Sequence, residues 1–507
     1  MTLRYTEHLL ATDKIYEFDF PTVVGTRFSN DKNTSGPADQ WVANPYLTKD
    51  TPSPSTFNVT ATVNAGLPLN YIACDTHPVK VDFVSDSTAK LSLQPGSKAT
   101  DDRDFILKYR LTGDKIITGL LLHEDEKLRE NFFLLTVQPP EKPKLTDIPD
   151  RDYVFVVDVS GSMNGFPLDT SKELLENLIG SLRPTDHFNI LFFAGGNKVP
   201  SPTPLPATQA NFRKALRMLD GQSGNGATQL LPALKEAFAL PKSEGTSRSM
   251  VVVSDGYVSF ERDAFGLIRD NLNDANVFTF GIGSSVNPFL IEGMARAGQG
   301  EPFIVTTKKH AKDEATRLRK LLTSPVLTDV EITFNDEFEA YDIEPRTYPD
   351  VFADRPVVVF GKYRGKPTGA IEVAGISGKE KIKLSDTISA PNSEEDNAAL
   401  PYLCIATLSD TISTDQNRDE IAEVTNLGLG YNLLTRYTAF IAIDDMVRKA
   451  DGLESEKVKQ PLPLPKNVPN SAVGGGSTPE PTMPLLLLVG GLFLLFQRSR
   501  REVADSV

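Results

Sequence analysis

The stretch VFVVDVSGSMNG (residues 154–165) joins a continuous apolar run to a polar loop. The run at 154–157 predicts a buried strand, and Asp158, Ser160 and Ser162 follow where this strand ends. Ligands of open α/β sheets bind outside the carboxyl ends of the strands, so these side chains lie where a site is expected. A carboxylate and two hydroxyls are hard oxygen ligands, which suit Mg²⁺, Mn²⁺ or Ca²⁺ better than Zn²⁺ or Cu²⁺.

Strand-like and helical segments alternate along residues 153–322. Apolar runs such as FNILFF, SMVVVSD and VFTFGIG are separated by amphipathic stretches such as TSKELLENLIGSL and NFRKALRMLDG. Continuous apolar strands joined by amphipathic helices are typical of a mostly parallel sheet that helices cover on both faces. We therefore predict a Rossmann-like α/β domain over residues 150–324.

Short β-like runs separated by turn residues flank this domain on both sides. VKVDFVS and DFILKYRL belong to a β-rich region at 55–140, and DVEITF and RPVVVFGKYRG to a second region at 326–447 that also has a helical segment. The predicted fold class is α/β plus β, with the α/β domain inserted between β-sandwich-like regions. Since an insertion leaves its neighbours joined, we expect the two β regions to lie close together.

Two further loops at the same edge of the predicted sheet carry matching side chains. GNGATQL places Thr228 ahead of a helix, and VVVSDGY places Asp255 at the end of another buried strand. Each motif alone has an ordinary structural explanation, because short polar side chains satisfy turns and a Thr often caps a helix. All three motifs in order at strand ends favour a single site to which five side chains contribute.

This combination of Asp-x-Ser-x-Ser, a distant Thr and a distant Asp-Gly resembles the metal-ion-dependent adhesion site of von Willebrand factor type A domains. The resemblance implies that the hydroxyls of Ser160, Ser162 and Thr228 coordinate a divalent cation. Asp158 and Asp255 would act directly or through water. Mg²⁺ is the expected ion, with Mn²⁺ or Ca²⁺ as alternatives, and one open position would accept an acidic group of a partner.

The flanking regions resemble a narrower architecture. YEFDFPTVVGTRFS (residues 16–29) is similar to the last strands of a vault/inter-alpha-trypsin (VIT) domain, so residues 1–30 are expected to be the remnant of an N-terminally truncated VIT domain. DFILKYRL, FFLLTVQPP and the closing LTRYTAFIAID resemble the rest of the inter-alpha-trypsin-inhibitor heavy-chain architecture. The Asp-Pro-His context for glycosaminoglycan attachment is not in the sequence, so that covalent chemistry is not implied.

The C-terminal part is predicted to be a disordered linker at 453–484, rich in Pro, Gly, Ser and charge. The segment 479–501 resembles a bacterial PEP-CTERM sorting signal, which implies processing by an exosortase-type enzyme during export. Its apolar run, 483–496, would span about 21 Å as a helix, against about 30 Å of hydrocarbon. The alternative is a short tail anchor followed by stop-transfer arginines. The residues of this signal are Pro479, Glu480, Pro481, Arg498, Arg500 and Arg501.

Charge and the absence of catalytic motifs argue against two classes of function, nucleic-acid binding and catalysis. A formal charge of −14 and a pI near 5.0 disfavour a nucleic-acid binder, which would carry a basic stripe. The two cysteines, Cys74 and Cys404, lie far apart, and we favour inert core thiols over a disulfide. The five histidines are scattered and no GxSxG, HExxH or P-loop motif occurs, so we do not expect an enzyme.

The resulting hypothesis is a metal-dependent adhesion or protein-binding module of the bacterial cell envelope or extracellular matrix, with its C-terminal segment membrane-associated. Its expected partner is a protein or matrix ligand that presents a carboxylate. One alternative is a structural matrix protein in which the metal only stabilises the fold. Another is an intracellular metal-dependent enzyme or chelatase partner, which the export-like tail disfavours.

Overall fold

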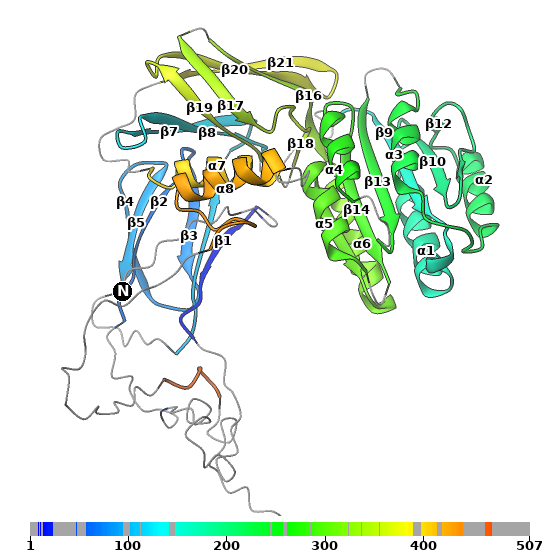
Figure 1. Ribbon diagram of the computed structural model, residues 1–507, viewed down its shortest axis with the longest axis horizontal. Helices are drawn as coiled ribbons and strands as arrows, with labels where there is room; N and C mark the ends of the chain where they lie inside the picture. The colour runs from blue at the N-terminus through cyan, green and yellow to red at the C-terminus, as the bar shows by residue number, and fades with distance from the viewer. Residues whose placement is uncertain are drawn as a thin grey trace, which may run out of the picture.

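A computed structural model of the chain shows an α/β domain beside two β-rich units (Figure 1). The residues it describes are 9, 11, 14–23, 47, 57–94, 102–111, 113–140, 148–243, 246–256, 261–283, 286–322, 324–335, 337–353, 355–388, 397–412, 418–439 and 462–468. The predicted sorting segment at 479–501 lies outside these residues. None of the helices in the described part of the chain has the length and apolar character that crossing a membrane requires.

The α/β domain is built on a seven-stranded sheet whose strand order is β11-β10-β9-β13-β14-β15, with β12 also paired to β10. Its parallel strands are β9 (Arg151–Asp158), β10 (His187–Phe193), β13 (Ser247–Ser254), β14 (Asn276–Ile282) and β15 (Gln299–Val305). Two short strands, β11 (Asn197–Lys198) and β12 (Leu205–Pro206), pair with β10 in antiparallel fashion. All residues of β9, β13 and β14 are buried, which accounts for their continuous apolar runs.

Helices cover both faces of this sheet, and β9 shows how. Phe155 and Val157 pack in one core with α1 (Phe166–Gly180), α2 (Gln209–Asp220) and α6 (Lys308–Leu322). Val154 and Val156 point the other way, into a core with α3 (Leu230–Ala239), α4 (Glu261–Asp270) and α5 (Pro288–Ala297). Successive strand residues alternate between faces, so one strand supplies both cores. The predicted α/β domain with a mostly parallel sheet is confirmed.

The α/β domain is inserted between two strands that pair with each other. The chain leaves β8 (Glu130–Gln138), forms the domain, and returns through β16 (Pro325–Phe334) to β19 (Val357–Gly365). β8 and β19 are antiparallel neighbours, with Leu134 opposite Phe360. The two β regions therefore share a sheet, as expected when a domain is inserted.

Two four-stranded sheets form the β-rich unit beside the α/β domain (Figure 1). One has the order β17-β19-β8-β7, and the other has the order β18-β16-β20-β21. Phe133 and Val359 from the first pack with Val330 and Val373 from the second in one core. The remaining strands are β7 (Ile117–Asp125), β17 (Phe338–Glu344), β18 (Val351–Phe352), β20 (Gly369–Ser377) and β21 (Glu380–Ile388).

The N-terminal strands form two three-stranded sheets, β1-β6-β3 and β2-β5-β4. These strands are β1 (Tyr16–Phe20), β2 (Thr60–Asn64), β3 (Leu69–Cys74), β4 (Val79–Phe83), β5 (Thr88–Leu93) and β6 (Phe105–Leu111). Strand pairing crosses two of the domain boundaries expected from the sequence. β1 pairs with β6, which joins residues 1–30 to the region at 55–140. β7 pairs with β8 and β8 pairs with β19, which joins the end of that region to the region at 326–447. The cause is that a strand pairs with whichever strand edge the fold leaves beside it, whatever its position in the sequence.

Helices α7 (Leu400–Ile412) and α8 (Arg418–Gly430) follow β21. Leu400 and Cys404 of α7 pack on Phe132 and Phe360, on the face of the β8–β19 pair that points away from the β16 sheet. Cys74 and Cys404 are both free thiols. Within the predicted linker, residues 462–468 are described, and Lys466 donates its backbone N–H to the carbonyl of Asp102 at 2.8 Å.

Candidate metal centre

Asp158, the last residue of β9, is fully buried at the carboxyl edge of the sheet. Its Oδ1 accepts the backbone N–H of Ser160 at 2.9 Å, and its Oδ2 accepts the hydroxyl of Ser254 at 2.7 Å. Burial raises the pKa of the Asp158 carboxyl, and the nearby charge of Asp255 raises it further, while the bonds from Ser160 and Ser254 act in the opposite direction. The carboxylate is therefore held at both oxygens in a site that disfavours uncompensated negative charge.

Three hydroxyls extend from this carboxylate toward the surface. Ser160 Oγ is 3.2 Å from Ser162 Oγ, and Thr228 Oγ1 donates to Ser160 Oγ at 3.0 Å. Ser160 is buried, Thr228 is half-buried and Ser162 is exposed. Ser160 and Ser162 belong to the loop after β9, where a single 3₁₀ turn spans Gly161–Met163, and Thr228 precedes α3. Side chains 68 residues apart are thus brought into direct contact.

Backbone hydrogen bonds hold these two loops together. Gly161 donates its N–H to the carbonyl of Gly226 at 3.0 Å, and Asn225 donates to the carbonyl of Val159 at 3.0 Å. Gly226 has a φ of +89°, which a residue with a side chain rarely adopts. A Cβ added to Gly224 would lie 2.7 Å from the backbone nitrogen of Asn164. The glycines of GNGATQL therefore permit the close approach that places Thr228 beside Ser160.

Asp255 enters from the third loop, directly after β13, and is 4% exposed. Its carbonyl accepts the N–H of Asn287, the residue before α5, at 3.2 Å. Gly256 has a φ of +83°, and a Cβ there would meet Asn287 Cβ at 3.0 Å. Asp255 directly follows Ser254, whose hydroxyl donates to Asp158 Oδ2 at 2.7 Å, so the chain at Asp255 lies beside Asp158 at the edge of the sheet.

The predicted five residues therefore lie together at one edge of the sheet, and they fit a hard divalent cation. They provide two carboxylates and three hydroxyls, with neither nitrogen nor sulfur, which is a donor set for Mg²⁺, Mn²⁺ or Ca²⁺. Two buried like charges also favour a bound cation. Across the described ranges, no cluster of three or more His, Cys, Asp or Glu side chains forms an alternative metal site. Ser254 was not singled out from the sequence, where its signal is a hydroxyl residue immediately before Asp-Gly.

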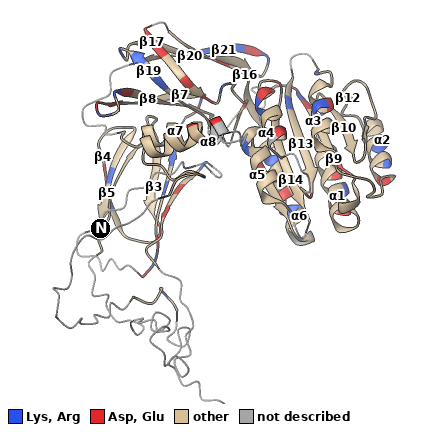
Figure 2. Ribbon diagram, viewed as in Figure 1, with Lys and Arg blue, Asp and Glu red and all other residues tan. Residues whose placement is uncertain are grey.

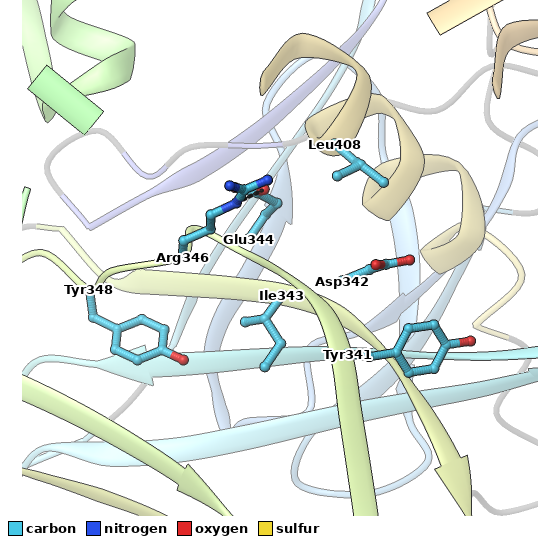
Figure 3. A pocket seen from close by; sticks show the side chains of 7 residues that line it. All are labelled: Tyr341, Asp342, Ile343, Glu344, Arg346, Tyr348 and Leu408. Carbon is cyan, nitrogen blue, oxygen red and sulfur yellow. Dashed lines mark ion pairs between the residues drawn. The ribbon is translucent and has the colours of Figure 1, made fainter. Parts of the chain in front are cut away.

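A pocket of about 360 Å³ lies elsewhere, between β17, the loop that follows it, and α7 (Figure 3). The lining residues are Tyr341, Asp342, Ile343, Glu344, Arg346, Tyr348 and Leu408. Arg346 Nε lies 3.6 Å from Glu344 Oε1. The pocket belongs to the β-rich unit, so it is separate from the candidate metal centre at the sheet edge of the α/β domain.

Residues 151–302 match the family model of the von Willebrand factor type A domain. The chain contains a von Willebrand factor type A domain. Similarity to known proteins extends beyond this domain into the rest of the chain. The chain is 23% identical to von Willebrand factor A domain-containing protein 5A of Mus musculus, over 95% of this chain and 64% of that protein. A von Willebrand factor A domain-containing protein of Dictyostelium discoideum is also 23% identical, over 76% of this chain and 48% of that protein.

The chain thus spans about half to two thirds of the length of these two relatives. Among solved structures, a von Willebrand factor type A protein from Catenulispora acidiphila has a TM-score of 0.45 at 13% identity, over 63% of this chain and 88% of that one. Proximal thread matrix protein 1 of the mussel byssus, with zinc in its MIDAS motif, has a TM-score of 0.28 at 14% identity, over 39% and 48%. Type A domains are generally metal-dependent protein-interaction modules.

Proposed function

We propose that this protein is a metal-dependent adhesion or protein-binding module, in which the type A domain binds an acidic group of a partner through a divalent cation. The observation that carries the proposal is the contact of the Ser160 hydroxyl with both Ser162 and Thr228, beside the buried Asp158. Hydroxyls add ligands without adding charge. A cation held by two carboxylates and three hydroxyls therefore keeps enough positive character to attract a further carboxylate.

The charge of the three loops supports strict dependence on metal. Residues 158–165, 221–229 and 254–260 contain no Lys or Arg, and their only charged side chains are Asp158 and Asp255. Over the described elements as a whole, basic and acidic residues are interspersed (Figure 2). Without a cation, the loops would repel an acidic ligand, so the metal must supply the attraction. Mg²⁺ is the proposed ion, and Mn²⁺ or Ca²⁺ would fit the same oxygen ligands.

Binding is proposed rather than catalysis because the five site residues include no group suited to proton transfer near neutral pH other than two carboxylates beside the expected cation. His187 begins β10, at the opposite end of the sheet from Asp158. His77 is buried between the rings of Phe57 and Phe105. An intracellular enzyme partner remains the alternative in which the same metal site serves a catalytic complex.

The location proposed for this activity is the bacterial cell envelope or the extracellular matrix. The support is the sequence of the tail, where Pro479–Pro481, an apolar run and Arg498–Arg501 resemble a PEP-CTERM signal read by an exosortase-type enzyme. The proposal includes membrane association through this tail and, at the other end, strands of a VIT-like domain. Fractionation of cells expressing the chain with and without residues 479–507 tests it, since loss of the tail should release the protein from the envelope.

The central experiment is a metal titration coupled to ligand capture. The full chain is loaded with Mg²⁺ or Mn²⁺ and passed over an immobilised peptide with a single Glu, with the matching Gln peptide as control. Capture should require both the metal and Glu, and a chelator should abolish it while far-UV circular dichroism stays unchanged. Metal-independent capture, or no measurable metal binding, would contradict the proposal. Unfolding on chelation would favour the structural-metal alternative.

A further inference from the structure

Ser254 joins the two acidic loops of the candidate metal centre. It is the last residue of β13, fully buried, and its Oγ lies 2.7 Å from Asp158 Oδ2. The register explains the contact, because Val253 is paired with Val157, which makes Ser254 and Asp158 the next neighbours along the same two strands. Asp255, the second carboxylate of the site, follows Ser254 directly in the chain.

The direction of this hydrogen bond follows from a second contact. Ser254 Oγ accepts the backbone N–H of Gly256 at 3.0 Å. A serine hydroxyl has one proton and can accept through its lone pairs, so the proton remains available for the Asp158 carboxylate, which can only accept when ionised. The hydroxyl is thereby oriented from the Gly256 side and donates toward Asp158.

Asp158 transmits this restraint to the hydroxyl ligands. Its other oxygen, Oδ1, accepts the N–H of Ser160, whose own hydroxyl contacts both Ser162 and Thr228. If the bond to Oδ2 is removed, the buried carboxylate loses a neutral donor and becomes free to rotate away from Ser160. A substitution of Ser254 should therefore disturb the position of the Ser160 hydroxyl, although Ser160 follows a different strand.

We infer that Ser254 is a positioning residue of the proposed metal centre: its hydroxyl holds the Asp158 carboxylate in the orientation that divalent cation binding requires. The inference rests on the proposed function, since it concerns the same site. Groups that orient metal ligands in this way commonly change metal affinity about 10- to 100-fold when removed. The chemistry is the same for Mg²⁺ and Mn²⁺, because the restraint acts on the ligand rather than on the ion.

The test compares Ser254→Thr with Ser254→Val in the full chain. Threonine and valine have nearly the same shape and crowd the buried position equally, but only threonine keeps the hydroxyl. Mn²⁺ affinity is measured by isothermal titration calorimetry, and the shift in Tm on adding Mn²⁺ is the second readout. Ser254→Thr should bind Mn²⁺ about 10- to 100-fold more tightly than Ser254→Val. Ser249→Ala, a buried serine earlier in β13, should bind Mn²⁺ like the wild type.

The outcomes separate this inference from the proposed function. Equal Mn²⁺ affinities for the Thr and Val variants, both folded, would overturn the positioning role while leaving the metal site intact. If the wild-type protein itself binds neither Mn²⁺ nor Mg²⁺, the proposed function fails and the inference fails with it. If neither bulky variant folds, Ser254→Ala and Ser254→Gly replace them, and wild-type affinity in a folded variant of either kind would again overturn the role.

Discussion

The backbone N–H of Asp350 donates to Oδ1 of Asn276 at 3.1 Å, which joins the segment before β18 to the first residue of β14. The hydroxyl of Ser247, the first residue of β13, also donates to the Asp350 carboxylate. Two residues further on, the ring of Phe352 meets that of Phe278 edge to face, with centroids 5.6 Å apart. Asp350 therefore lies at the junction between the type A domain and the β-rich unit.

This junction should be sensitive to pH. Burial raises the pKa of Asp350 to about 6, with a further contribution from the charge of Asp329, while Ser247 and Lys242 act in the opposite direction. The folded protein then binds this proton more tightly than the unfolded chain, so the stabilising contribution is complete below about pH 4 and is lost as the pH rises to about 6. In Asp350→Asn, this loss of stability with rising pH should be absent.

The measurement is urea unfolding of the wild type and of Asp350→Asn between pH 4 and pH 8. Relative to the variant, the wild type should lose about 1–3 kcal/mol of unfolding free energy between pH 4 and pH 6, and the difference should then stay constant. Asp169→Asn, at an exposed position in the first turn of α1, serves as the control. A wild-type and Asp350→Asn difference that does not vary with pH would show that Asp350 is not the group responsible.

Replacing Asp255 should weaken metal-dependent binding without destabilising the protein in chelator. Asp255→Ala removes one of the two carboxylates of the site, so Mn²⁺ affinity should fall by at least about tenfold, together with capture of a Glu-bearing ligand. Without metal, Asp255 mainly repels Asp158. The Tm in chelator should therefore be unchanged or slightly higher. Unchanged Mn²⁺ affinity in titration calorimetry would remove Asp255 from the site.

The contact between the first two loops should depend on Gly224. In Gly224→Ala, the added Cβ would lie 2.7 Å from the nitrogen of Asn164 and 2.9 Å from the carbonyl oxygen of Ser160, so the loops must separate. We expect lower Mn²⁺ affinity and a loss of about 1–3 kcal/mol in stability. Gly196→Ala is the matched control, because a Cβ there meets nothing within 4 Å. Equal effects of the two substitutions would contradict this explanation.

Lys362 should be important for the stability of the β-rich unit. It is 5% exposed, and its Nζ lies 2.9 Å from Glu130 Oε1 and 3.3 Å from the hydroxyl of Tyr431. Burial lowers the pKa of Lys362, but hydrogen bonding to Glu130 and Tyr431 outweighs it and keeps the ammonium charged. Lys362→Met leaves Glu130 without this cation and should cost about 2–3 kcal/mol.

The matched control for this substitution is Lys383→Met. Lys383 pairs with Glu372 at 2.7 Å across β20 and β21, but the side chain of Lys383 is 59% exposed and that of Glu372 is 39% exposed. Loss of this pair should change the unfolding free energy by less than about 0.5 kcal/mol. Thermal and urea unfolding of both variants provide the comparison. A Lys362→Met variant as stable as Lys383→Met would mean that the buried pair does not stabilise the unit.

The α/β domain and the candidate site residues could be predicted from local sequence patterns. Buried parallel strands and amphipathic helices have local signatures, because a strand covered on both faces must be apolar at every position, as in Val154–Val157. Asp158, Thr228 and Asp255 could be placed at one edge without coordinates. Parallel strands that are joined through helices end on the same side of their sheet, so each loop was assigned by its position after a strand or before a helix.

The pairing of the β strands and the side chains that support the site could not be predicted in this way, because both depend on contacts between distant segments. Leu134 lies opposite Phe360 although the 225 intervening positions include a complete domain, and nothing in either strand specifies that partner. The contact of Ser254 with Asp158 and the burial of Asp350 also depend on neighbours from distant segments. Periodicity reports which face of an element is buried, but not what covers it, because many partners satisfy the same apolar face and only the assembled chain selects one.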